Sequence, residues 1–260
     1  MKSRSQSRKE DYHKEFAQFY DLLSYKKYAT EVNCLAINIL DGISCSPLRI
    51  LSVGCGTGIH ESILAESEHD VTGIDTSAEM ISLAKKKNIA AKKGKRCNFI
   101  HQDIRNFEED GFDVALSLFN VVNCLSGISS LCSFFLGIEK TLNRNGILFF
   151  ECWNGMACIL KPPTIIERNF DYLGLKRTAV PSLDPIRQNL VINYNISGIH
   201  NGELVSIDSV HHITLFTRME IEFALASAGF EIMAEYTDLA SELEPVSDNS
   251  RMISFVCKKR

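Results

Sequence analysis

The chain has 260 residues, of which 45% are apolar and 23% are charged, and its formal net charge is −4. This length and apolar content suit one large core, so we expect one domain, or one domain with an insertion, rather than two equal halves. The weak negative charge excludes a global field that would recruit nucleic acid or an anionic membrane, and no apolar run approaches the ~20 residues of a membrane span. We therefore expect no nucleic-acid partner and no membrane partner.

The first residues and the cysteines both indicate a cytoplasmic protein. Residues 1–10 lack the apolar core of a secretory signal. The nine cysteines are scattered, most of them inside apolar segments, and no Cys-x-x-Cys pair occurs. This usage is typical of reduced, buried cysteines.

Two helical patterns precede the first predicted strand. Phe16, Tyr20 and Leu23 share one face of the first helix, and the apolar positions of the second begin at Tyr28. Both tyrosines fit the core-facing side of an amphipathic helix, which is one interpretation of their role.

The stretch from Ile50 to Gly58 predicts a buried strand that breaks into three glycines, and helical spacing follows at Ile59, Ile63 and Leu64. Strand, glycine turn and helix form the first unit of a doubly wound α/β domain, in which ligands bind beyond the carboxyl ends of the strands. Glycine is needed where the backbone takes positive φ or a ligand approaches closely. The dinucleotide fingerprint Gly-x-Gly-x-x-Gly/Ala is not met, because Ile59 stands where its third small residue belongs.

An acid closes the next predicted strand. Asp75 ends the run 70–75 and lies 21 residues after Gly54, near the spacing of roughly 20 residues for an acid that binds a ribose hydroxyl. Thr76 to Glu79 has a capping-box pattern, which predicts that a helix starts there.

Three more strands continue the sheet, separated by a helix and a turn. The second of them is apolar almost throughout, as in a parallel strand that is covered on both faces. The loop after it, 120–125, falls at the ligand edge. The strands are predicted over 96–101, 112–119 and 147–152, the helix over 130–142 and the turn at Asn145-Gly146.

The region after the fifth strand has the pattern of antiparallel strands. Residues 190–196 and 204–213 contain alternating apolar and polar side chains, and Asn201-Gly202 between them is a strong hairpin signal. We expect residues 156–213 to form an antiparallel insertion that covers the carboxyl edge of the main sheet.

The final segment returns to the main sheet. Thr217 to Glu220 is a second capping box, and the helix that it starts ends at Gly229. Two strands over 230–236 and 252–257 complete the sheet as an antiparallel pair. The predicted fold is therefore α/β, with a doubly wound, mostly parallel sheet of seven strands and an antiparallel insertion after the fifth.

The glycine turn with its acid resembles the first motif of class I S-adenosylmethionine (SAM) methyltransferases, whose usual form is close to Val-Leu-Asp-Val-Gly-Cys-Gly-Thr-Gly. Further matches resemble methyltransferases of sugar and polysaccharide biosynthesis, including enzymes that N-methylate nucleotide-linked amino sugars. The resemblance implies a Rossmann-like fold, SAM as cofactor, S-adenosylhomocysteine as product and a small-molecule substrate. It also implies a helical lid over 1–45 and a core over 46–155 and 214–260, with 156–213 on the substrate side. The matching segments are Phe19–Asp21, Val71–Met80, Gln102–Arg105, Phe149–Gly155 and Ile213–Thr217.

The resemblance also implies which residues contact the cofactor. Asp103 would accept the adenine amino group and Ile104 would pack against the ring, although a turn-capping aspartate is the alternative for Asp103. A tyrosine in the Phe19–Asp21 segment would reach the cofactor or the substrate. The full implied set is Tyr20, Tyr28, Gly54, Cys55, Gly56, Thr57, Gly58, Asp75, Thr76, Met80, Asp103, Ile104 and Phe119.

Three departures from the family pattern bear on the function. Ser52 stands where the family has an acid before the glycines, so the contact is either lost, with lower cofactor affinity, or replaced. Asn123 and Cys124 stand where amino-sugar methyltransferases often have a histidine, and Ser209-Val210-His211 keeps a histidine without the family's acids. The loop 120–125 also lacks the Asn/Asp-Pro-Pro-Tyr/Phe motif of enzymes that methylate nucleic-acid amines, which argues against DNA or RNA as substrate.

Methyl transfer from a sulfonium is an in-line displacement, so alignment and the exclusion of water supply much of the rate. The acceptor must also lose a proton, and histidine suits the role of base near neutral pH. We predict that His211 is this base, with His212 and His60 as further candidates. The alternative for His211 is a hydrogen-bonded position within the sheet.

Asn120, Trp153 and Tyr194 are predicted to line the acceptor pocket, with a core position as the alternative for Trp153. No cluster of His, Cys, Asp or Glu has metal-ligand spacing, so no metal is expected. We expect a SAM-dependent methyltransferase that modifies N or O of a small polar acceptor, a nucleotide-linked sugar or other carbohydrate intermediate, as a monomer or homodimer. The alternatives are methylation of an amino acid or other small metabolite, and a non-catalytic SAM-binding protein; an NAD-dependent oxidoreductase is disfavoured by Ile59.

Overall fold

The main body of the protein is a seven-stranded sheet. A computed structural model describes residues 16–23, 47–66, 68–90, 97–237, 244–247 and 250–260. The sheet has the order β10-β11-β5-β4-β1-β2-β3, in which β1 to β5 are parallel and β11 pairs antiparallel with both β5 and β10. Its strands are β1 (Arg49–Val53), β2 (Asp70–Asp75), β3 (Cys97–His101), β4 (Phe112–Ser117), β5 (Leu142–Trp153), β10 (Phe230–Tyr236) and β11 (Met252–Lys259).

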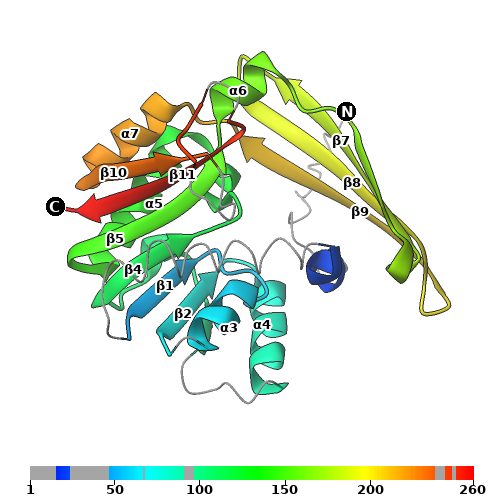
Figure 1. The fold of residues 1–260 in the computed structure, drawn as a ribbon, viewed down its shortest axis with the longest axis horizontal. Coiled ribbons are helices and arrows are strands. Elements are labelled where there is room, and N and C mark those ends of the chain that lie inside the picture. The colour runs from blue at the N-terminus through cyan, green and yellow to red at the C-terminus, as the bar shows by residue number, and fades with distance from the viewer. Residues whose placement is uncertain (1–15, 24–46, 67, 91–96, 238–243, 248–249) are drawn as a thin grey trace, which may run out of the picture.

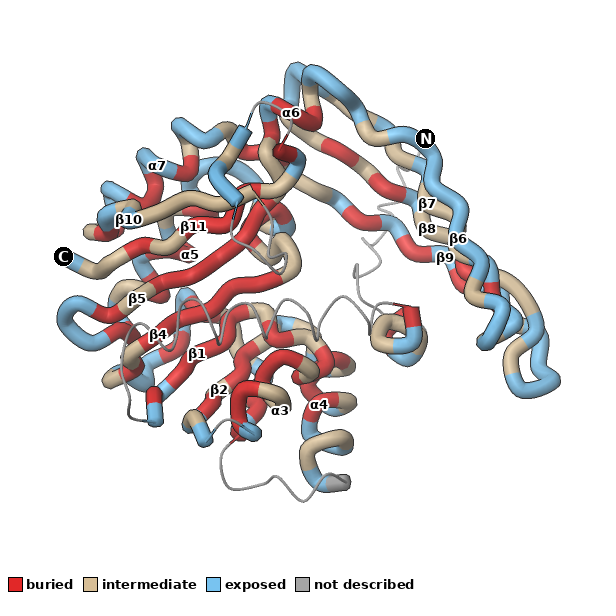
Figure 2. Tube along the Cα trace, viewed as in Figure 1, coloured by how far each residue is buried: buried red, intermediate tan, exposed pale blue. Residues whose placement is uncertain are grey.

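Helices cover both faces of this sheet (Figure 1). On one face, α3 (Ile59–Glu66) and α4 (Ala78–Ala90) pack over a core that includes Phe149. On the other, α5 (Gly127–Thr141) and α7 (Arg218–Ser227) pack over a core in which the rings of Phe150 and Phe255 stack with centroids 4.9 Å apart. The central strands are therefore buried on both sides, as Figure 2 shows, and this burial explains their unbroken apolar sequences.

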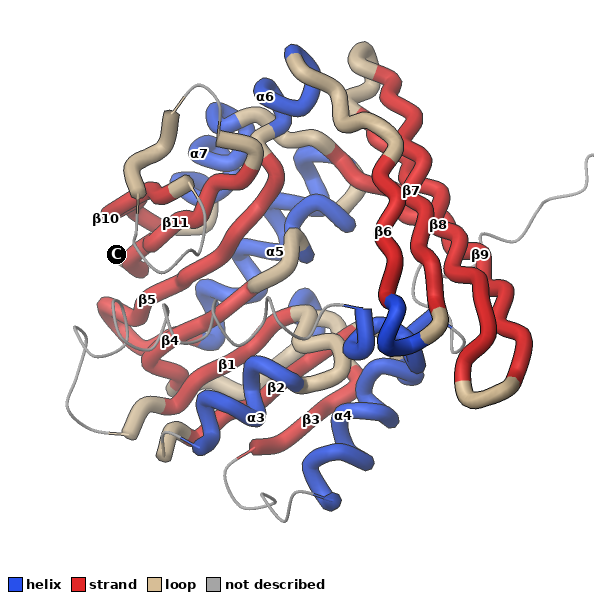
Figure 3. Tube along the Cα trace, turned by 45° about the vertical axis from the view of Figure 1, so that its right-hand side comes forward, coloured by secondary structure: helices blue, strands red, loops and turns tan. Residues whose placement is uncertain are grey.

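A second, antiparallel sheet stands beyond the carboxyl ends of the parallel strands, with residues 16–23 as a helix between the two sheets (Figures 1 and 3). Asn201 and Gly202 both have positive φ, 51° and 84°, and form the predicted two-residue turn. The predicted antiparallel insertion is thus confirmed, although only two of its strands were expected by residue range. Its strands, in spatial order, are β6 (Ile166–Phe170), β7 (Leu175–Asp184), β8 (Asn189–His200) and β9 (Glu203–Thr214).

Some element boundaries differ from the sequence-based ones for local reasons. β4 ends at Ser117 because Phe119 and Asn120 take positive φ, 62° and 61°. β5 starts at Leu142, and the predicted turn at Asn145 is an irregularity of its pairing with β4, where Asn145 has φ 63°. The remaining short helices are η2 (Ile104–Asn106), η3 (Val121–Cys124), α6 (Gly155–Leu160) and η4 (Asp171–Leu173).

The two predicted capping boxes have different outcomes. At α7 the box is present, because Thr217 N–H donates to Glu220 Oε2 (2.7 Å) and Glu220 N–H donates to Thr217 Oγ1 (3.3 Å). At α4 the prediction was wrong by one residue, since Met80 N–H donates to Ser77 Oγ (3.3 Å) rather than to Thr76. The second N-terminal helical pattern, with Tyr28, lies outside the described residues.

Candidate active site

Glycine is required at each of the three positions after β1, but for different structural reasons. All have positive φ, 75° at Gly54, 55° at Gly56 and 77° at Gly58. A Cβ on Gly58 would lie 2.4 Å from the Phe99 ring, and one on Gly54 would lie 2.4 Å from Val121, so both allow close packing. A Cβ on Gly56 would meet nothing within 4 Å. Gly56 therefore faces open space, and its own requirement is the positive φ.

Asp75 connects this loop to the end of β2. Gly56 N–H donates to its Oδ2 (2.8 Å), and Ser77 N–H donates to its Oδ1 (2.8 Å). Burial raises the pKa of the carboxyl, and the backbone hydrogen bonds oppose that shift. Because a carboxylate has about four acceptor positions, the backbone hydrogen bonds from Gly56, Ser77 and Thr76 leave at least one for a ligand hydroxyl.

A cleft of about 520 Å³ opens at this point, at the carboxyl ends of the parallel strands. Its volume falls within the roughly 300–1,000 Å³ typical of small-molecule sites. The side chains of Cys55 and Thr57 lie behind the loop, and Gly58 is not part of the wall. Of the expected cofactor residues, the wall contains Tyr20, Gly54, Gly56, Asp75, Thr76, Met80, Asp103, Ile104 and Phe119.

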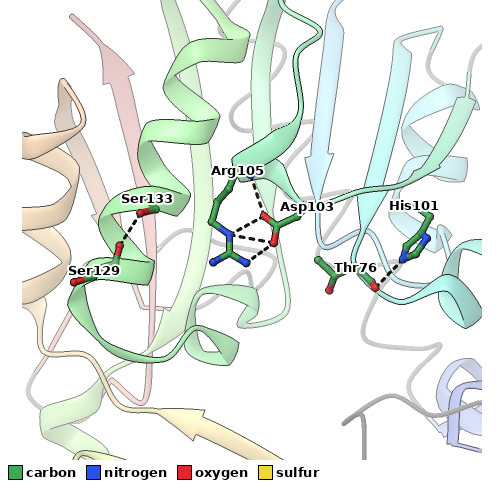
Figure 4. Close-up of polar contacts among 6 residues, drawn as sticks. All are labelled: Thr76, His101, Asp103, Arg105, Ser129 and Ser133. Atoms are coloured by element: carbon green, nitrogen blue, oxygen red, sulfur yellow. Dashed lines mark hydrogen bonds and ion pairs between the residues drawn. The ribbon is translucent and has the colours of Figure 1, made fainter.

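Asp103 lies in the cleft wall and is fixed by Arg105 (Figure 4). The carboxylate accepts hydrogen bonds from the Arg105 guanidinium and from its backbone N–H (2.9 Å), which caps η2. These bonds hold the pKa of Asp103 below its usual range. On the facing side, His101 Nε2 lies 3.0 Å from the Thr76 carbonyl oxygen, which ties β3 to the turn after β2 (Figure 4).

A second cavity, of about 170 Å³, lies between the cleft and the antiparallel sheet. The structure brings all four residues predicted for catalysis and substrate binding to its wall, although they come from β5, β8, β9 and the loop after β4. The complete wall consists of Phe16, Tyr20, Leu23, Phe119, Asn120, Cys124, Trp153, Arg177, Tyr194, His211, His212 and Ile213.

Of the two candidate bases in the wall of the second cavity, His211 is the buried one. It is 9% exposed, its Nε2 lies 3.0 Å from Ser209 Oγ on the same strand, and its ring meets Phe16 and Tyr194 edge-on at 5.0 and 4.9 Å between centroids. Burial raises the pKa of Tyr194, which keeps that hydroxyl neutral. His211 is therefore both hydrogen-bonded within the sheet and part of the cavity wall.

The cleft and the second cavity share a wall made of Tyr20, Phe119 and Cys124. Tyr20 is held there by its neighbour Asp21, whose Oδ1 accepts a hydrogen bond from Thr57 Oγ1 (2.5 Å) and whose Oδ2 accepts one from Lys87 Nζ (2.7 Å). Asp21 thus fastens helix 16–23 to the glycine loop and to α4 at once.

The loop that carries Phe119 is fixed from below by two buried polar residues. Phe119 N–H donates to Glu151 Oε1 (2.7 Å), which supports the pair of positive-φ residues at 119 and 120. The Asn123 side chain donates to the Thr214 carbonyl oxygen (2.8 Å) and accepts from Trp153 N–H (2.9 Å). The loop is therefore tied to β5 and β9 together.

Sequence reasoning missed several of these contributors. Asp21 was quoted only as part of a matching segment, and Glu151 and Arg177 were given no role. The alternating pattern of 190–213 gave the strands of the cavity wall, but the long-range partners of Asp21 and Glu151 have no local signal. The one sequence feature that could have indicated such a contact is an acid inside an otherwise apolar strand, as at Glu151, because a buried carboxyl group needs a polar partner.

The doubly wound sheet, the glycine loop at its switch point after β1 and the acid at the end of the neighbouring β2 are typical of an α/β enzyme that binds a nucleoside-containing ligand in the cleft. Residues 45–180, more than half of the chain, match the family model described as "Methyltransferase domain". The chain belongs to this family and is a SAM-dependent methyltransferase.

Individual relatives agree with this assignment. The chain is 27% identical over 228 residues to dTDP-3-amino-3,6-dideoxy-alpha-D-glucopyranose N,N-dimethyltransferase of Streptomyces fradiae, with 85% of this chain and 86% of the relative covered. A SAM-dependent methyltransferase from Clostridium acetobutylicum superposes with a TM-score of 0.79 at 17% identity, covering 94% and 97%. A SAM-bound amino pentose methyltransferase from Micromonospora echinaspora superposes with a TM-score of 0.71 at 20% identity, also covering 94% and 97%.

The cofactor is SAM, and the cleft fits it. Gly56 leaves open space beside the strand ends, and Asp75 presents acceptor positions there. In the part of the chain that the structure describes, no group of three or more His, Cys, Asp or Glu residues is placed to hold a metal ion. Within the same residues, no helix combines the length and apolar character needed to cross a bilayer.

Proposed function

We propose that this enzyme transfers the methyl group of SAM to N or O of a small polar acceptor, a nucleotide-linked sugar or other carbohydrate intermediate. The observation that carries the proposal is the shared wall of Tyr20, Phe119 and Cys124, which places a second cavity next to the cofactor cleft. The Streptomyces fradiae relative, by its name, dimethylates a dTDP-linked amino sugar, and the similarity spans most of both chains.

In this proposal, helix 16–23 and the antiparallel sheet close over the acceptor, and the parallel sheet holds the cofactor. When bound, SAM supplies a methyl group that is already activated on a sulfonium. The protein then has to align the acceptor with that methyl group and to keep water out of the cavity. The aromatic side chains of Phe16, Trp153 and Tyr194 in the cavity wall suit both tasks.

We assign the role of base to His211. Its ring is buried in the cavity wall, and the contact with Ser209 Oγ fixes the orientation of the imidazole. A neutral imidazole can take the proton that the acceptor nitrogen or oxygen must lose, a contribution of roughly 10²–10⁴-fold in rate. His212 also reaches the cavity but is an exposed residue, and buried His60 packs 5.6 Å from the ring of Phe119.

The charges around the cavity favour an acceptor that carries a negative group. None of the described residues that line the cavity is an aspartate or glutamate, whereas Arg177 is part of the wall. Arg168 lies directly opposite Arg177 in the pairing of β6 with β7, and like charges at such positions destabilise a sheet. Glu167 on β6 forms an ion pair with Lys176 on the other face of these strands (2.9 Å), and Asp184 at the end of β7 pairs with Arg187.

A phosphate suits the Arg177 guanidinium in the cavity wall, because guanidinium groups bind phosphate in a bidentate manner. The diphosphate of a nucleotide-linked sugar has that chemistry, and a free amino acid or a neutral sugar does not. This is the physical reason to prefer a nucleotide-linked acceptor over the other small metabolites.

The test is a transfer assay with methyl-labelled SAM against dTDP- and UDP-linked amino and neutral sugars, the corresponding free sugars, and free amino acids. We expect kcat/KM for a nucleotide-linked sugar to exceed that for its free sugar by about tenfold or more, the effect of one charge-assisted hydrogen bond. Transfer to amino acids with no preference for nucleotide-linked compounds would contradict the proposal. Tight SAM binding without transfer to any acceptor would indicate a non-catalytic protein.

A further inference from the structure

A buried carboxyl group lies behind the glycine loop and has no established role. Glu61, in the first turn of α3, is 1% exposed. Its Oε1 accepts a hydrogen bond from Ser52 Oγ (2.5 Å), and its Oε2 has no hydrogen-bond partner among the described residues. A buried acceptor without a partner is costly, about 1–3 kcal/mol, so a carboxyl oxygen kept in this position calls for a ligand.

A small cavity of about 30 Å³ contains this group, which is enough for one water-sized or ammonium-sized group. Glu61 and Ser52 form one side of it and the glycine loop forms another. The small cavity meets the larger cofactor cleft, because the two share Tyr20, Gly54, Gly56, Leu118 and Phe119 in their walls.

The place of this cavity identifies the part of the cofactor that reaches it. SAM consists of adenosine, a sulfonium that carries the methyl group, and an amino-acid end with an ammonium and a carboxylate. Asp75 and Asp103 take the adenosine in the proposed site, and the methyl group must face the acceptor cavity across Tyr20 and Phe119. The amino-acid end is then left for the side of the glycine loop where Glu61 lies.

We propose that Glu61, oriented by Ser52, binds the α-ammonium group at the amino-acid end of the cofactor. The ionised carboxylate of Glu61 attracts the ammonium group and repels the carboxylate of the cofactor, so it also sets the orientation of the amino-acid end. Strand position 52, where the resembling motif has an acid, supplies only a hydroxyl here, and the helix supplies the carboxyl group instead. The inference does not depend on which acceptor is methylated.

The electrostatics agree with this role. Burial raises the pKa of Glu61 in the ligand-free protein, whereas nearby His60, the Ser52 hydroxyl and Lys87 lower it. A bound ammonium would add to the groups that favour the carboxylate, so the charged form gains a partner when the cofactor binds.

Calorimetry without any acceptor tests the proposal. S-adenosylhomocysteine carries the α-ammonium group, and 5′-methylthioadenosine lacks the amino-acid end. In Glu61→Gln we expect the affinity for S-adenosylhomocysteine to fall roughly 10- to 150-fold, the loss of one charge-assisted bond, while the affinity for 5′-methylthioadenosine stays within about twofold. The control Glu66→Gln, at the exposed end of the same helix, should change neither affinity.

Two further variants keep the proposal testable if Glu61→Gln unfolds. Ser52→Ala should lower the affinity for S-adenosylhomocysteine by about threefold to tenfold and leave the affinity for 5′-methylthioadenosine unchanged, because the carboxyl group loses its orienting partner. Ser52→Asp combined with Glu61→Gln returns a carboxylate from the strand and should recover most of the lost affinity. Equal losses for both ligands, or no loss for either, would overturn the role of Glu61. If the unmodified protein bound neither ligand, the cofactor cleft itself would be misassigned.

Discussion

Replacing Asp75 with alanine tests the central contact of the cofactor cleft. The carboxylate accepts backbone hydrogen bonds from Gly56 and Ser77, both at 2.8 Å, and keeps an acceptor position for a ligand hydroxyl. Asp75→Ala therefore removes the expected ribose partner and, at the same time, one of the hydrogen bonds between the glycine loop and the end of β2.

The expected loss of affinity follows from these bonds. A hydrogen bond to a charged acceptor contributes about 1.5–3 kcal/mol, so each ribose hydroxyl that loses Asp75 should weaken SAM binding roughly 10- to 150-fold. Loosening of the loop at Gly56 adds to this loss. Calorimetric titration with SAM should thus detect little or no binding to Asp75→Ala.

Asp113→Ala is the matched control. Asp113 also accepts a backbone hydrogen bond, from Arg49 N–H (2.9 Å), but it lies at the opposite edge of the same sheet, near the start of β4. This variant should lose stability without losing SAM affinity. A dissociation constant for Asp75→Ala within about threefold of the unmodified protein would refute the role of Asp75 in the cleft.

Four further outcomes are expected. His211→Ala should lower kcat by roughly 10²–10⁴-fold with little change in the Kd for SAM, as measured by transfer assay and calorimetry; unchanged turnover would remove it from the mechanism. Arg177→Gln should raise the KM for a nucleotide-linked acceptor about tenfold, while Lys176→Gln on the other face of the same strand should leave it unchanged. Asp21→Asn should raise both the Kd for SAM and the KM for acceptor several-fold, because one carboxylate fastens the helix that lines both cavities. Burial raises the pKa of Glu61 above its ordinary 4.5, so the folded, ligand-free protein binds the proton more tightly than the unfolded chain does. The neutral carboxyl group therefore favours the fold at low pH, and this contribution to the free energy of unfolding is lost as the pH rises through the folded-state pKa. Denaturant titrations from pH 4 upward should show that loss in the unmodified protein and not in Glu61→Gln.

The sequence predicted the parts of the fold that depend on short-range patterns. The glycine turn, the acid at the end of β2 and the hairpin at Asn201-Gly202 each follow from backbone or spacing requirements that a local stretch contains. The capping box at Thr217 was predicted for the same reason.

The parts that could not be predicted depend on distant contacts. β4 stops early because Phe119 and Asn120 take positive φ, which Glu151 supports from another strand. β7 contains Pro181, which normally argues against a strand, but β6 pairs with β7 only as far as Ala179, so Pro181 lies on an unpaired edge.

The replacement of the acid at position 52 shows the same limit. Its loss was visible in the sequence, but the carboxyl group of Glu61, which we propose replaces it, reaches Ser52 only through the way α3 packs against β1. Nothing in the spacing between residues 52 and 61 distinguishes this contact from an ordinary helix glutamate, and only its complete burial reveals it.

Tyr20, on the helix 16–23 between the two sheets, lines the cofactor cleft, the second cavity and the small cavity at Glu61. A rigid displacement of that helix would therefore open the donor and acceptor compartments in one movement. We therefore expect exchange of spent cofactor and release of the methylated product to be coupled, with their order in the kinetic cycle set by the contacts at Asp21.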